Sequence, residues 1–461
     1  MLTATALLMV VGTGAQGQTD EKPFIGRVQM KFTTDRLTPE ALWAMGRIGQ
    51  FSLNENGNTA VYNVNYYSVK ENKSHSVLYT MNMADSHSVL LTQTADSESG
   101  AVFIKGGQKI AYLSAVSGTN QVWEMNIDGS GRRQLSFEEK DVIDFLFSPD
   151  GRKVLLVKEV PNHSVIQEND ADLPLSSGMV INDLMYKHWD SYIKSVPHPF
   201  LAGFDGDKIS SSVDLLEGEP YECPMLPFGG IEQLAWSPDS KTIAYTCRKK
   251  TGKAYAISTD SDIYLYDLTT QETRNLCKPM DYTAPEVNET STLEAQGVNV
   301  QTEDYNVGYD QNPQFSPDGR YVAWSSMERD GYESDRTRLC VFDLKTGKKT
   351  YVTESFESGV NEFCWANDNK TLYFTGVWHG RTQIYRTNLK GQVKRLTDDV
   401  CDYVLVGLMP DNKTLIAKRH SISQADEVYA VALKGDKGIA RQITEENKLF
   451  YDNLTFGEVK E

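Results

Sequence analysis

The side chains best suited to contacting a ligand are concentrated in one short segment. Residues 184–190 read Leu-Met-Tyr-Lys-His-Trp-Asp, and the candidate groups lie on Tyr186, His188, Trp189 and Asp190. Rings with polar tips are typical of ligand-contacting and interface surfaces. These residues are therefore candidates for a binding wall or an interdomain contact, with partly exposed side chains. A structural role also fits: Tyr186 and Trp189 would pack the segment onto its support while the charged groups face water.

Two pairs of adjacent glutamates, Glu138-Glu139 and Glu445-Glu446, are weaker candidates. Both pairs follow the last strand of a predicted repeat, and adjacent glutamates in a turn are usually solvated. We therefore expect both pairs to be exposed and not to bind a ligand. A glycosidase would need two carboxylates about 5–10 Å apart in a cleft, and the sequence alone cannot establish such a distance.

The sequence contains no Gly-x-Ser-x-Gly motif, which is the turn that presents a nucleophilic serine in α/β-hydrolases. Gly129-Ser130-Gly131 is instead predicted to form a hairpin turn. The sequence also has no phosphate-binding loop and no metal-ligand spacing. We therefore expect no catalytic residue, no cofactor and no metal ion in this chain.

A repeated turn indicates which elements position the candidate segment. In Phe147-Ser148-Pro149-Asp150-Gly151 each residue of Ser-Pro-Asp-Gly suits its place in a type I turn. Clear copies lead into apolar strands at Trp236-Ser237-Pro238-Asp239 and Phe315-Ser316-Pro317-Asp318. We predict that Asp150, Asp239 and Asp318 have structural roles, in which each accepts hydrogen bonds from backbone groups of its own turn.

Seven copies of this turn predict a β-propeller. Their first residues, 51, 103, 147, 236, 315, 365 and 408, are 52, 44, 89, 79, 50 and 43 residues apart. Four of these steps match a four-stranded blade of about 40–50 residues. The two long steps each hold either a second blade or an insertion. Since strand patterns are sparse there, we predict an all-β fold of seven blades with insertions at 158–198 and 277–312; eight blades also fit.

Composition limits the class of protein further. The net charge of −17 argues against a nucleic-acid groove, which needs a basic surface. Apart from the N-terminus, no apolar run approaches the ~18 residues of a membrane span. Six cysteines lie at positions 223, 247, 277, 340, 364 and 401. They allow many disulfide pairings in an exported protein, whereas Cys340 and Cys364 also fit as small core residues.

The two ends of the chain are predicted to differ from the propeller at 51–444. Residues 1–17 resemble a secretory signal with cleavage after Ala15 or Gly17, which predicts export to the periplasm or the extracellular space. Residues 18–50 are predicted to form an arm and a short helix, with Thr38 as N-cap and Pro39 at the first helical position. Residues 445–461 are predicted to be a linker that contains an apolar strand at 449–456.

These motifs together resemble the propeller half of the prolyl oligopeptidase family, most closely the secreted bacterial peptidases of the dipeptidyl peptidase five type. The resemblance covers about 30–461 and depends on the repeated turns, the 184–190 segment, the Thr38-Pro39-Glu40 lead-in and Asp310-Gln311-Asn312-Pro313. The repeated turn is shared with other propellers, including the translocation protein TolB. The lead-in and the 184–190 segment are more specific.

The resemblance implies a function in two parts. In that family an α/β-hydrolase domain follows the propeller and carries the catalytic Ser, Asp and His. None of these can be assigned to a residue of this chain, so we expect it to gate access for short peptides and to be inactive alone. The full-length protein could form a homodimer. The alternative is a stand-alone periplasmic propeller of the TolB kind that serves as a binding or scaffolding module.

Overall fold

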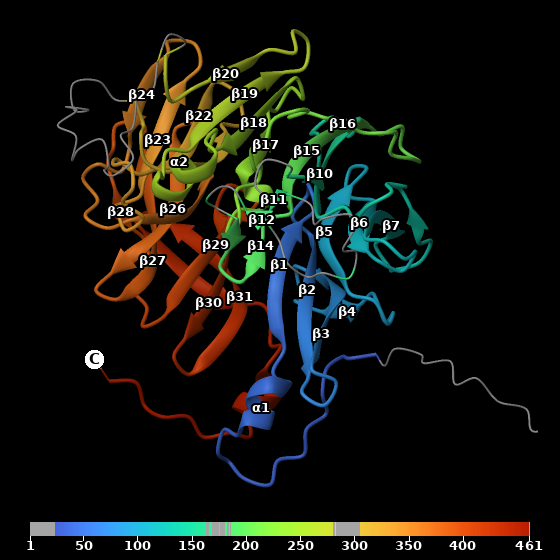
Figure 1. Ribbon diagram of the computed structural model, residues 1–461. Helices are drawn as coiled ribbons and strands as arrows, with labels where there is room; N and C mark the ends of the chain where they lie inside the picture. The colour runs from blue at the N-terminus through green and yellow to red at the C-terminus, as the bar shows by residue number, and fades with distance from the viewer. Residues whose placement is uncertain are drawn as a thin grey trace, which may run out of the picture.

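Seven four-stranded antiparallel sheets form a ring in the computed structural model (Figure 1). The structure describes residues 24–162, 166–167, 175, 180–181, 184, 186–279, 282 and 305–460. The strands of each sheet are paired in their order along the chain, so each sheet is one blade of a propeller. The predicted seven-bladed fold is therefore confirmed. No eighth blade is found among the described residues, where each of the two long steps, 147–236 and 236–315, contains a single four-stranded sheet.

The first three blades precede residue 215. Blade 1 contains β1 (Arg47–Leu53), β2 (Thr59–Ser68), β3 (Lys73–Asn82) and β4 (Ser88–Leu90). Blade 2 contains β5 (Glu98–Ile104), β6 (Lys109–Ser114), β7 (Gln121–Asn126) and β8 (Arg133–Gln134). Blade 3 contains β9 (Asp144–Phe147), β10 (Lys153–Pro161), β15 (Ser195–Gly203) and β16 (Val213–Asp214).

The other four blades follow in order. Blade 4 contains β17 (Leu234–Trp236), β18 (Thr242–Cys247), β19 (Asp262–Asp267) and β20 (Thr273–Asn275). Blade 5 contains β21 (Asp310–Phe315), β22 (Tyr321–Ser326), β23 (Arg338–Asp343) and β24 (Lys348–Tyr351). Blade 6 contains β25 (Val360–Trp365), β26 (Thr371–Trp378), β27 (Arg381–Asn388) and β28 (Lys394–Arg395). Blade 7 contains β29 (Asp402–Leu408), β30 (Thr414–Ser421), β31 (Gln424–Lys434) and β32 (Lys437–Gln442).

Short elements lie outside the blades. Within the insertion between β10 and β15, β11 (Ile166–Gln167) pairs with β12 (Val180–Ile181), and β13 (Lys187–His188) pairs with β14 (Ser191–Tyr192). The helical elements are α1 (Pro39–Ala44), η1 (Ile231–Gln233), α2 (Gly252–Ile257) and α3 (Lys448–Tyr451). The side chain of Thr38 accepts a hydrogen bond from the Ala41 amide, so the predicted N-cap of α1 is confirmed. No helix in the described part of the chain is long and apolar enough to cross a membrane.

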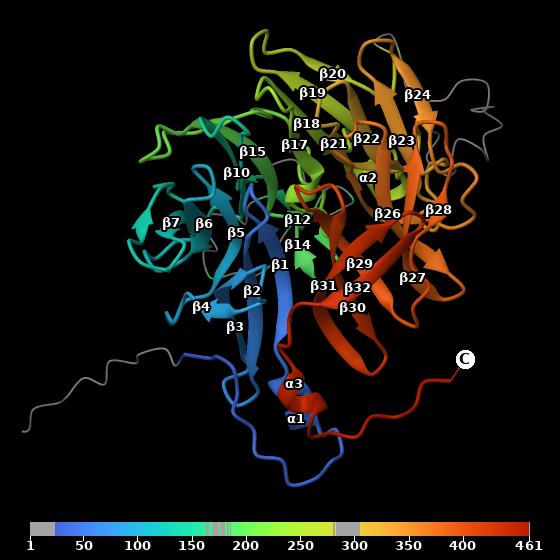
Figure 2. The same ribbon diagram turned by 180° about the vertical axis from the view of Figure 1, so that it is seen from behind.

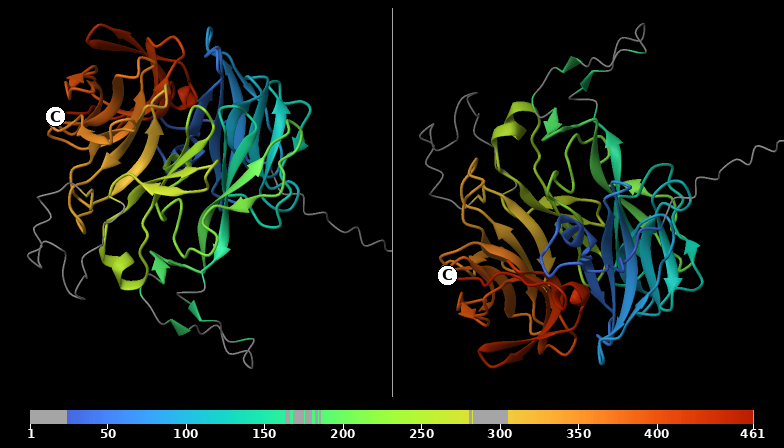
Figure 3. Two further views of the ribbon diagram at one scale, coloured as in Figure 1. Left: turned by 90° about the horizontal axis from the view of Figure 1, so that it is seen from above. Right: turned by 90° about the horizontal axis from the view of Figure 1, so that it is seen from below.

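The apolar core lies between the blades. Leu155 and Val157 of blade 3, for example, pack against Trp236 and Ile243 of blade 4. Six further clusters join the other neighbouring blades in the same way. The cluster between blades 7 and 1 closes the ring, and these blades lie next to one another in Figure 3. Each sheet is therefore buried on both of its faces, which explains the continuous apolar runs of the second strands.

The strand order places the connections on two opposite faces of the ring. The seven repeated turns join the first and second strands of the blades, and they lie on one face. The chain enters β1, leaves β32, and connects the second strand to the third on the other face. We call this second face the insertion face. It carries the 162–194 insertion, the 248–261 connection, and helices α1 and α3 (Figures 1 and 2).

Several predicted boundaries were wrong. Strands β10 and β15 pair without interruption from Lys153↔Gly203 to Pro161↔Ser195, so the first insertion is 162–194 and not 158–198. The second runs from 276 to 309, because β21 begins at Asp310. Blade 1 begins at Arg47 and not at residue 51, with a register shift between Ile48 and Phe51. In each case, strand pairing extends a strand into sequence that has no alternating pattern.

The predicted strand at 449–456 was also wrong. Residues 448–451 form α3, and Phe450 and Leu454 are buried against Ala41 and Met45 of the α1 region. An apolar residue at every fourth position fits a helical turn as well as an extended segment, and the contact with α1 decides between them. The predicted signal segment at 1–17 lies outside the described residues.

Candidate functional site

The predicted binding segment lies on the insertion face, and its side chains have different environments. The Trp189 side chain is 76 % exposed, and its ring contacts the 79 % exposed Phe228 with a centroid distance of 5.1 Å. The Asp190 side chain is exposed at the same turn. The Tyr186 ring is half-buried and stacks on Tyr192 at 6.3 Å. Trp189 is thus not part of the core, although its role in binding stays a prediction.

The His188 side chain points in the opposite direction, towards the blades of the propeller. Its Nε2 lies 2.6 Å from Oε1 of Glu222, which belongs to the connection between blades 3 and 4. Glu222 is 4 % exposed. Its Oε2 accepts hydrogen bonds from the Tyr255 hydroxyl at 2.6 Å and from the Leu226 amide at 3.0 Å. The insertion, the blade connection and α2 therefore meet at a single buried carboxylate.

The cationic side chain of Arg248 packs against Tyr255 and holds its ring. The guanidinium of Arg248 lies 3.8 Å from the centre of the Tyr255 ring and donates to the Ser258 carbonyl at 2.6 Å. Burial and Glu222 raise the pKa of Tyr255, so its hydroxyl stays protonated and donates to Glu222. Arg248 holds the ring by a cation–π contact, which fixes the direction of that hydroxyl.

A cavity of about 30 Å³ opens beside Glu222. Its lining includes Leu184 and Ile193 of the insertion, and Lys250 and Tyr255 of the 248–261 connection. Ligand pockets that enclose a small molecule have volumes of about 300–1,000 Å³. The cavity therefore holds a few water-sized groups at most.

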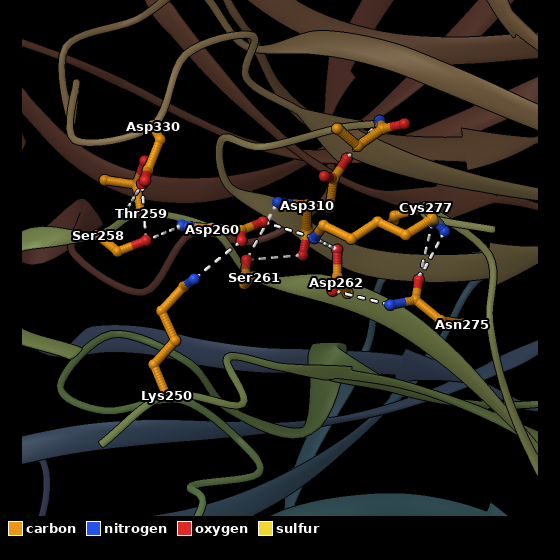
Figure 4. A network of polar contacts seen from close by, with 12 residues as sticks. Lys250, Ser258, Thr259, Asp260, Ser261, Asp262, Asn275, Cys277, Asp310 and Asp330 are labelled. Atoms are coloured by element: carbon orange, nitrogen blue, oxygen red, sulfur yellow. Dashed lines mark hydrogen bonds and ion pairs between the residues drawn. The ribbon is translucent and has the colours of Figure 1, made fainter. Parts of the chain in front are cut away.

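A network of buried charges lies farther along this face, between blades 4 and 5 (Figure 4). The Lys278 ammonium donates to both Asp260 and Asp262, and Lys250 pairs with Asp260 at 3.0 Å. Asp262 also accepts a hydrogen bond from Asn275 at 2.8 Å. Because Lys250 also lines the cavity beside Glu222, the network and the cavity share one side chain.

Burial sets the protonation of this network. It raises the pKa of Asp262, although Lys278 opposes that shift, and it raises the pKa of Asp310 well above the ordinary range. Asp310 is fully buried and accepts hydrogen bonds from the side-chain nitrogens of Trp324 and Asn306. Burial therefore favours the uncharged form of Asp310, while Lys278 balances the charge of the aspartates that it contacts.

Asp262, Cys277 and Asp310 place ligand-type atoms within 4.8 Å of one another. Thiolates and carboxylates are metal ligands, so the types of these side chains would suit a cation. However, the Lys278 ammonium already lies against Asp262, and burial raises the pKa of the Cys277 thiol, which favours its uncharged form. We therefore assign no metal to this cluster.

The turn aspartates lie on the opposite face. Oδ1 of Asp150 accepts from the Ser148 hydroxyl at 2.6 Å and from the Arg152 amide at 3.0 Å. Asp239 and Asp318 make the equivalent two contacts in their own turns. This geometry is that of a local turn; the effect of these residues on stability stays a prediction.

The expectation that both glutamate pairs are solvated was wrong for one member of each. Glu446 is buried and bonded to Arg27 and to the Tyr66 hydroxyl. Glu138 is half-buried and bonded to Lys158 and Ser212. Their partners lie between 20 and 419 residues away along the sequence. A pattern in the local sequence could not reveal such partners.

Known proteins are similar to this chain in sequence and in fold. No family model matches the chain. It is 41 % identical over 424 residues to "Dipeptidyl-peptidase 5" of Porphyromonas gingivalis, and 38 % identical over 444 residues to "Dipeptidyl-peptidase 5" of Porphyromonas endodontalis. These alignments cover 92 % and 96 % of this chain.

The chain is a homologue of dipeptidyl-peptidase 5. The resemblance inferred from its motifs is thereby confirmed. The chain spans 58 % and 59 % of the length of these two relatives.

Solved structures show the same fold at low sequence identity. The Pyrococcus horikoshii acylaminoacyl peptidase superposes with a TM-score of 0.60 at 15 % identity, over 90 % of this chain and 55 % of that chain. The β-propeller domain of the Trilobed protease from Pyrococcus furiosus, described as having an open velcro topology, gives a TM-score of 0.52 at 12 % identity. That alignment covers 87 % of this chain and 99 % of the other. Both comparisons support the propeller fold.

The sequence did not single out the centre of the site. Glu222, Tyr255 and Arg248 were all missed, although His188, which contacts Glu222, was a candidate. One usable signal was the stretch Glu222-Cys223-Pro224 to Gly230, where a carboxylate enters a proline- and glycine-rich connection between two strands. Functional groups are often carried by such connections on a rigid scaffold.

Proposed function

We propose that this chain is the substrate-gating propeller part of an exported serine peptidase that acts on short peptides. The observation that carries the proposal is the 41 % identity to a dipeptidyl-peptidase over 92 % of the chain. The sequence has no Gly-x-Ser-x-Gly motif, so the nucleophile, the base and the oxyanion hole would come from an α/β-hydrolase domain.

In this proposal the insertion face contacts the peptide. Trp189 and Phe228 offer two exposed rings, which can cover apolar side chains of a peptide. Glu222 lies beside the cavity, where each of its carboxylate oxygens is held by a hydrogen-bonded partner. The ring itself would admit short or unfolded chains and exclude folded proteins. Tyr186, His188, Trp189 and Asp190 thus remain proposed wall or interdomain residues.

A segment exchange tests this role. Residues 24–460 replace the matching segment of the Porphyromonas gingivalis dipeptidyl-peptidase 5, and the chimera is assayed with dipeptidyl chromogenic substrates. We expect turnover by the chimera and none by the 461-residue chain alone. Trp189→Ala in the chimera should raise KM more than it lowers kcat, because the ring contacts the peptide and not the reacting bond. Arg36→Ala, an exposed change on the arm, is the matched control.

Two results would contradict the proposal. Stoichiometric labelling of a serine in the isolated chain by a fluorophosphonate probe, with turnover, would mean that the chain carries its own catalytic site. A folded chimera without any peptidase activity would favour the alternative of a stand-alone binding propeller. Export is tested separately, by fractionating an expressing bacterium and sequencing the N-terminus of the product, which should begin at Gln16 or Gln18.

A further inference from the structure

Two of the six cysteines lie together in the core between blades 3 and 4. Cys223 is in the connection that follows β16, and Cys247 is the last residue of β18. Both side chains are fully buried and belong to the same apolar cluster. These residues are 24 positions apart in the sequence (247 minus 223) but adjacent in the fold.

Two contacts place the Cys247 thiol beside the backbone that leads into Cys223. The Cys247 thiol donates to the Glu222 carbonyl at 3.5 Å, and Glu222 immediately precedes Cys223. The Cys223 amide donates to the Pro197 carbonyl of β15 at 2.9 Å, which holds that backbone in place. The Cys247 sulfur therefore lies against the peptide unit that joins Glu222 to Cys223, and both cysteines are free thiols in this structure.

Electrostatics agrees with this geometry. Burial raises the pKa of the Cys223 thiol, and Cys247 is the next largest cause. For Cys277 the charged neighbours that raise the pKa after burial are Asp310 and Asp262, and for Cys364 burial alone raises it, to about 12. Cys223 thus has a second cysteine among the groups that affect its pKa, whereas Cys277 and Cys364 do not.

We propose that Cys223 and Cys247 form a disulfide bond when the folding chain meets a small-molecule disulfide. The Cys223 thiolate attacks the oxidant, displaces one thiol and forms a mixed disulfide. The Cys247 thiolate then attacks the Cys223 sulfur and releases the second thiol. The two cysteine sulfurs are oxidised, the oxidant is reduced to two thiols, and the two protons of the cysteines end on those thiols. Because both sulfurs are buried, the reaction takes place during folding or local opening.

The bond would act on the candidate site. It would join the connection that carries Glu222 to the end of β18, one residue before Arg248. Glu222 is held by His188 and Tyr255 through its carboxylate. The bond would hold the same residue through its backbone, so that the insertion and α2 meet a fixed carboxylate.

Peptide mapping tests the bond. The full chain is refolded with oxidised glutathione, alkylated in denaturant and digested with trypsin without reduction. Trypsin releases Cys223 in 209–241 and Cys247 in 242–248. We expect these two peptides joined, and both alkylated at cysteine after reduction. The thermal midpoint of the wild-type chain should fall by several degrees on reduction, because the bond restrains the unfolded chain.

Two variants keep the test decisive. Cys223→Ser should abolish the joined peptide and the dependence of the midpoint on reduction. Cys364→Ser, at a half-buried cysteine of blade 6, should preserve both. If Cys223 and Cys247 are both alkylated after oxidative refolding, or if either is joined to another cysteine, the proposal is wrong.

Discussion

The junction between blades 7 and 1 and the junction between blades 4 and 5 both combine an apolar cluster with ion pairs, but they bury the charges to different depths. At the blade 4–5 junction the Lys278 side chain is 6 % exposed, and its partners Asp260 and Asp262 are about as buried. At the blade 7–1 junction Arg27 is 47 % exposed, while its partner Glu446 is 3 % exposed. One pair lies in the protein interior and the other lies at its edge.

The two junctions also differ in how the chain crosses them. Blades 4 and 5 follow one another along the chain, with the 276–309 insertion between β20 and β21, whereas no strand of blade 1 completes the sheet of blade 7. The ring is instead closed by contacts between the two ends of the chain. Asn447 donates to the Gly46 carbonyl at 2.9 Å, Thr455 donates to the Asp35 carbonyl at 2.7 Å, and α3 packs on α1. We call these contacts the terminal clasp.

In this comparison, the contribution of an ion pair to stability depends on the environment of the charge that remains when its partner is removed. A buried carboxylate that loses its cation keeps its desolvation penalty, whereas an exposed guanidinium that loses its anion is solvated by water. The blade 4–5 network should therefore be the more sensitive to substitution. The terminal clasp should be the more sensitive to local opening, because it lacks a covalent connection.

The largest effect is expected for Lys278→Met. The change leaves Asp260 and Asp262 without the ammonium that contacts both, and it should lower the free energy of unfolding by about 3–5 kcal/mol. Urea unfolding followed by tryptophan fluorescence measures the loss. Lys345→Met, on an exposed turn of blade 5, is the control and should change it little. An equal loss in both variants would mean that the network has no special role.

A smaller effect is expected for Arg27→Ala. Glu446 keeps its hydrogen bond from the Tyr66 hydroxyl, so the loss should be about 1–3 kcal/mol. Hydrogen exchange should increase first in β1 and β31, which meet at the blade 7–1 junction. The control, Arg36→Ala, is on the same arm and exposed. Faster exchange spread evenly over all blades would argue against a local clasp.

Asp310 should make the blade 4–5 junction sensitive to pH. Burial raises its pKa above the ordinary 3.8, so the folded chain binds a proton that the unfolded chain has lost. This stabilisation is complete below pH 3.8 and is lost as the pH rises through the folded value. Asp310→Asn should therefore flatten the decline of unfolding free energy between about pH 5 and pH 8, which is at most about 1.4 kcal/mol per pH unit.

Asp343 gives the matched control for this titration. Arg320 lowers the pKa of Asp343 to about 2, so Asp343 is ionised in both the folded and the unfolded chain above pH 5. Asp343→Asn should leave the slope between pH 5 and pH 8 unchanged. If Asp310→Asn also leaves the slope unchanged, Asp310 is ionised in the folded chain.

The smallest effect is expected on the turn face, away from both junctions. Asp318→Ala removes an acceptor for the Ser316 hydroxyl and the Arg320 amide, and it should lower the free energy of unfolding by about 0.5–2 kcal/mol. Chemical unfolding measures this change, with Asp318→Asn as the conservative variant that keeps one acceptor. A loss of peptide binding in the chimera without any loss of stability would mean that Asp318 contacts a ligand.

The fold was largely predictable because its signals are local. The Ser-Pro-Asp-Gly turn or a variant of it, followed by an apolar strand, occurs seven times, so errors at single copies did not change the architecture. The ends of the strands were less predictable, because β10 continues to Pro161 only through pairing with β15. For the candidate site, the sequence indicated the segment with His188 and Trp189, but it gave no indication that one turns towards Glu222 and the other towards solvent.

The sequence left seven or eight blades open, but by itself it determined the propeller, the N-cap at Thr38 and the likeness to a family of peptidases. Each of these depends on residues within a few positions of one another, or on a pattern repeated along the chain. Only the tertiary structure decided that Glu446 is buried beside Arg27, that residues 448–451 form a helix, and that Cys223 lies beside Cys247. These facts depend on groups brought together by closure of the ring and packing of its blades, and no local pattern specifies such contacts.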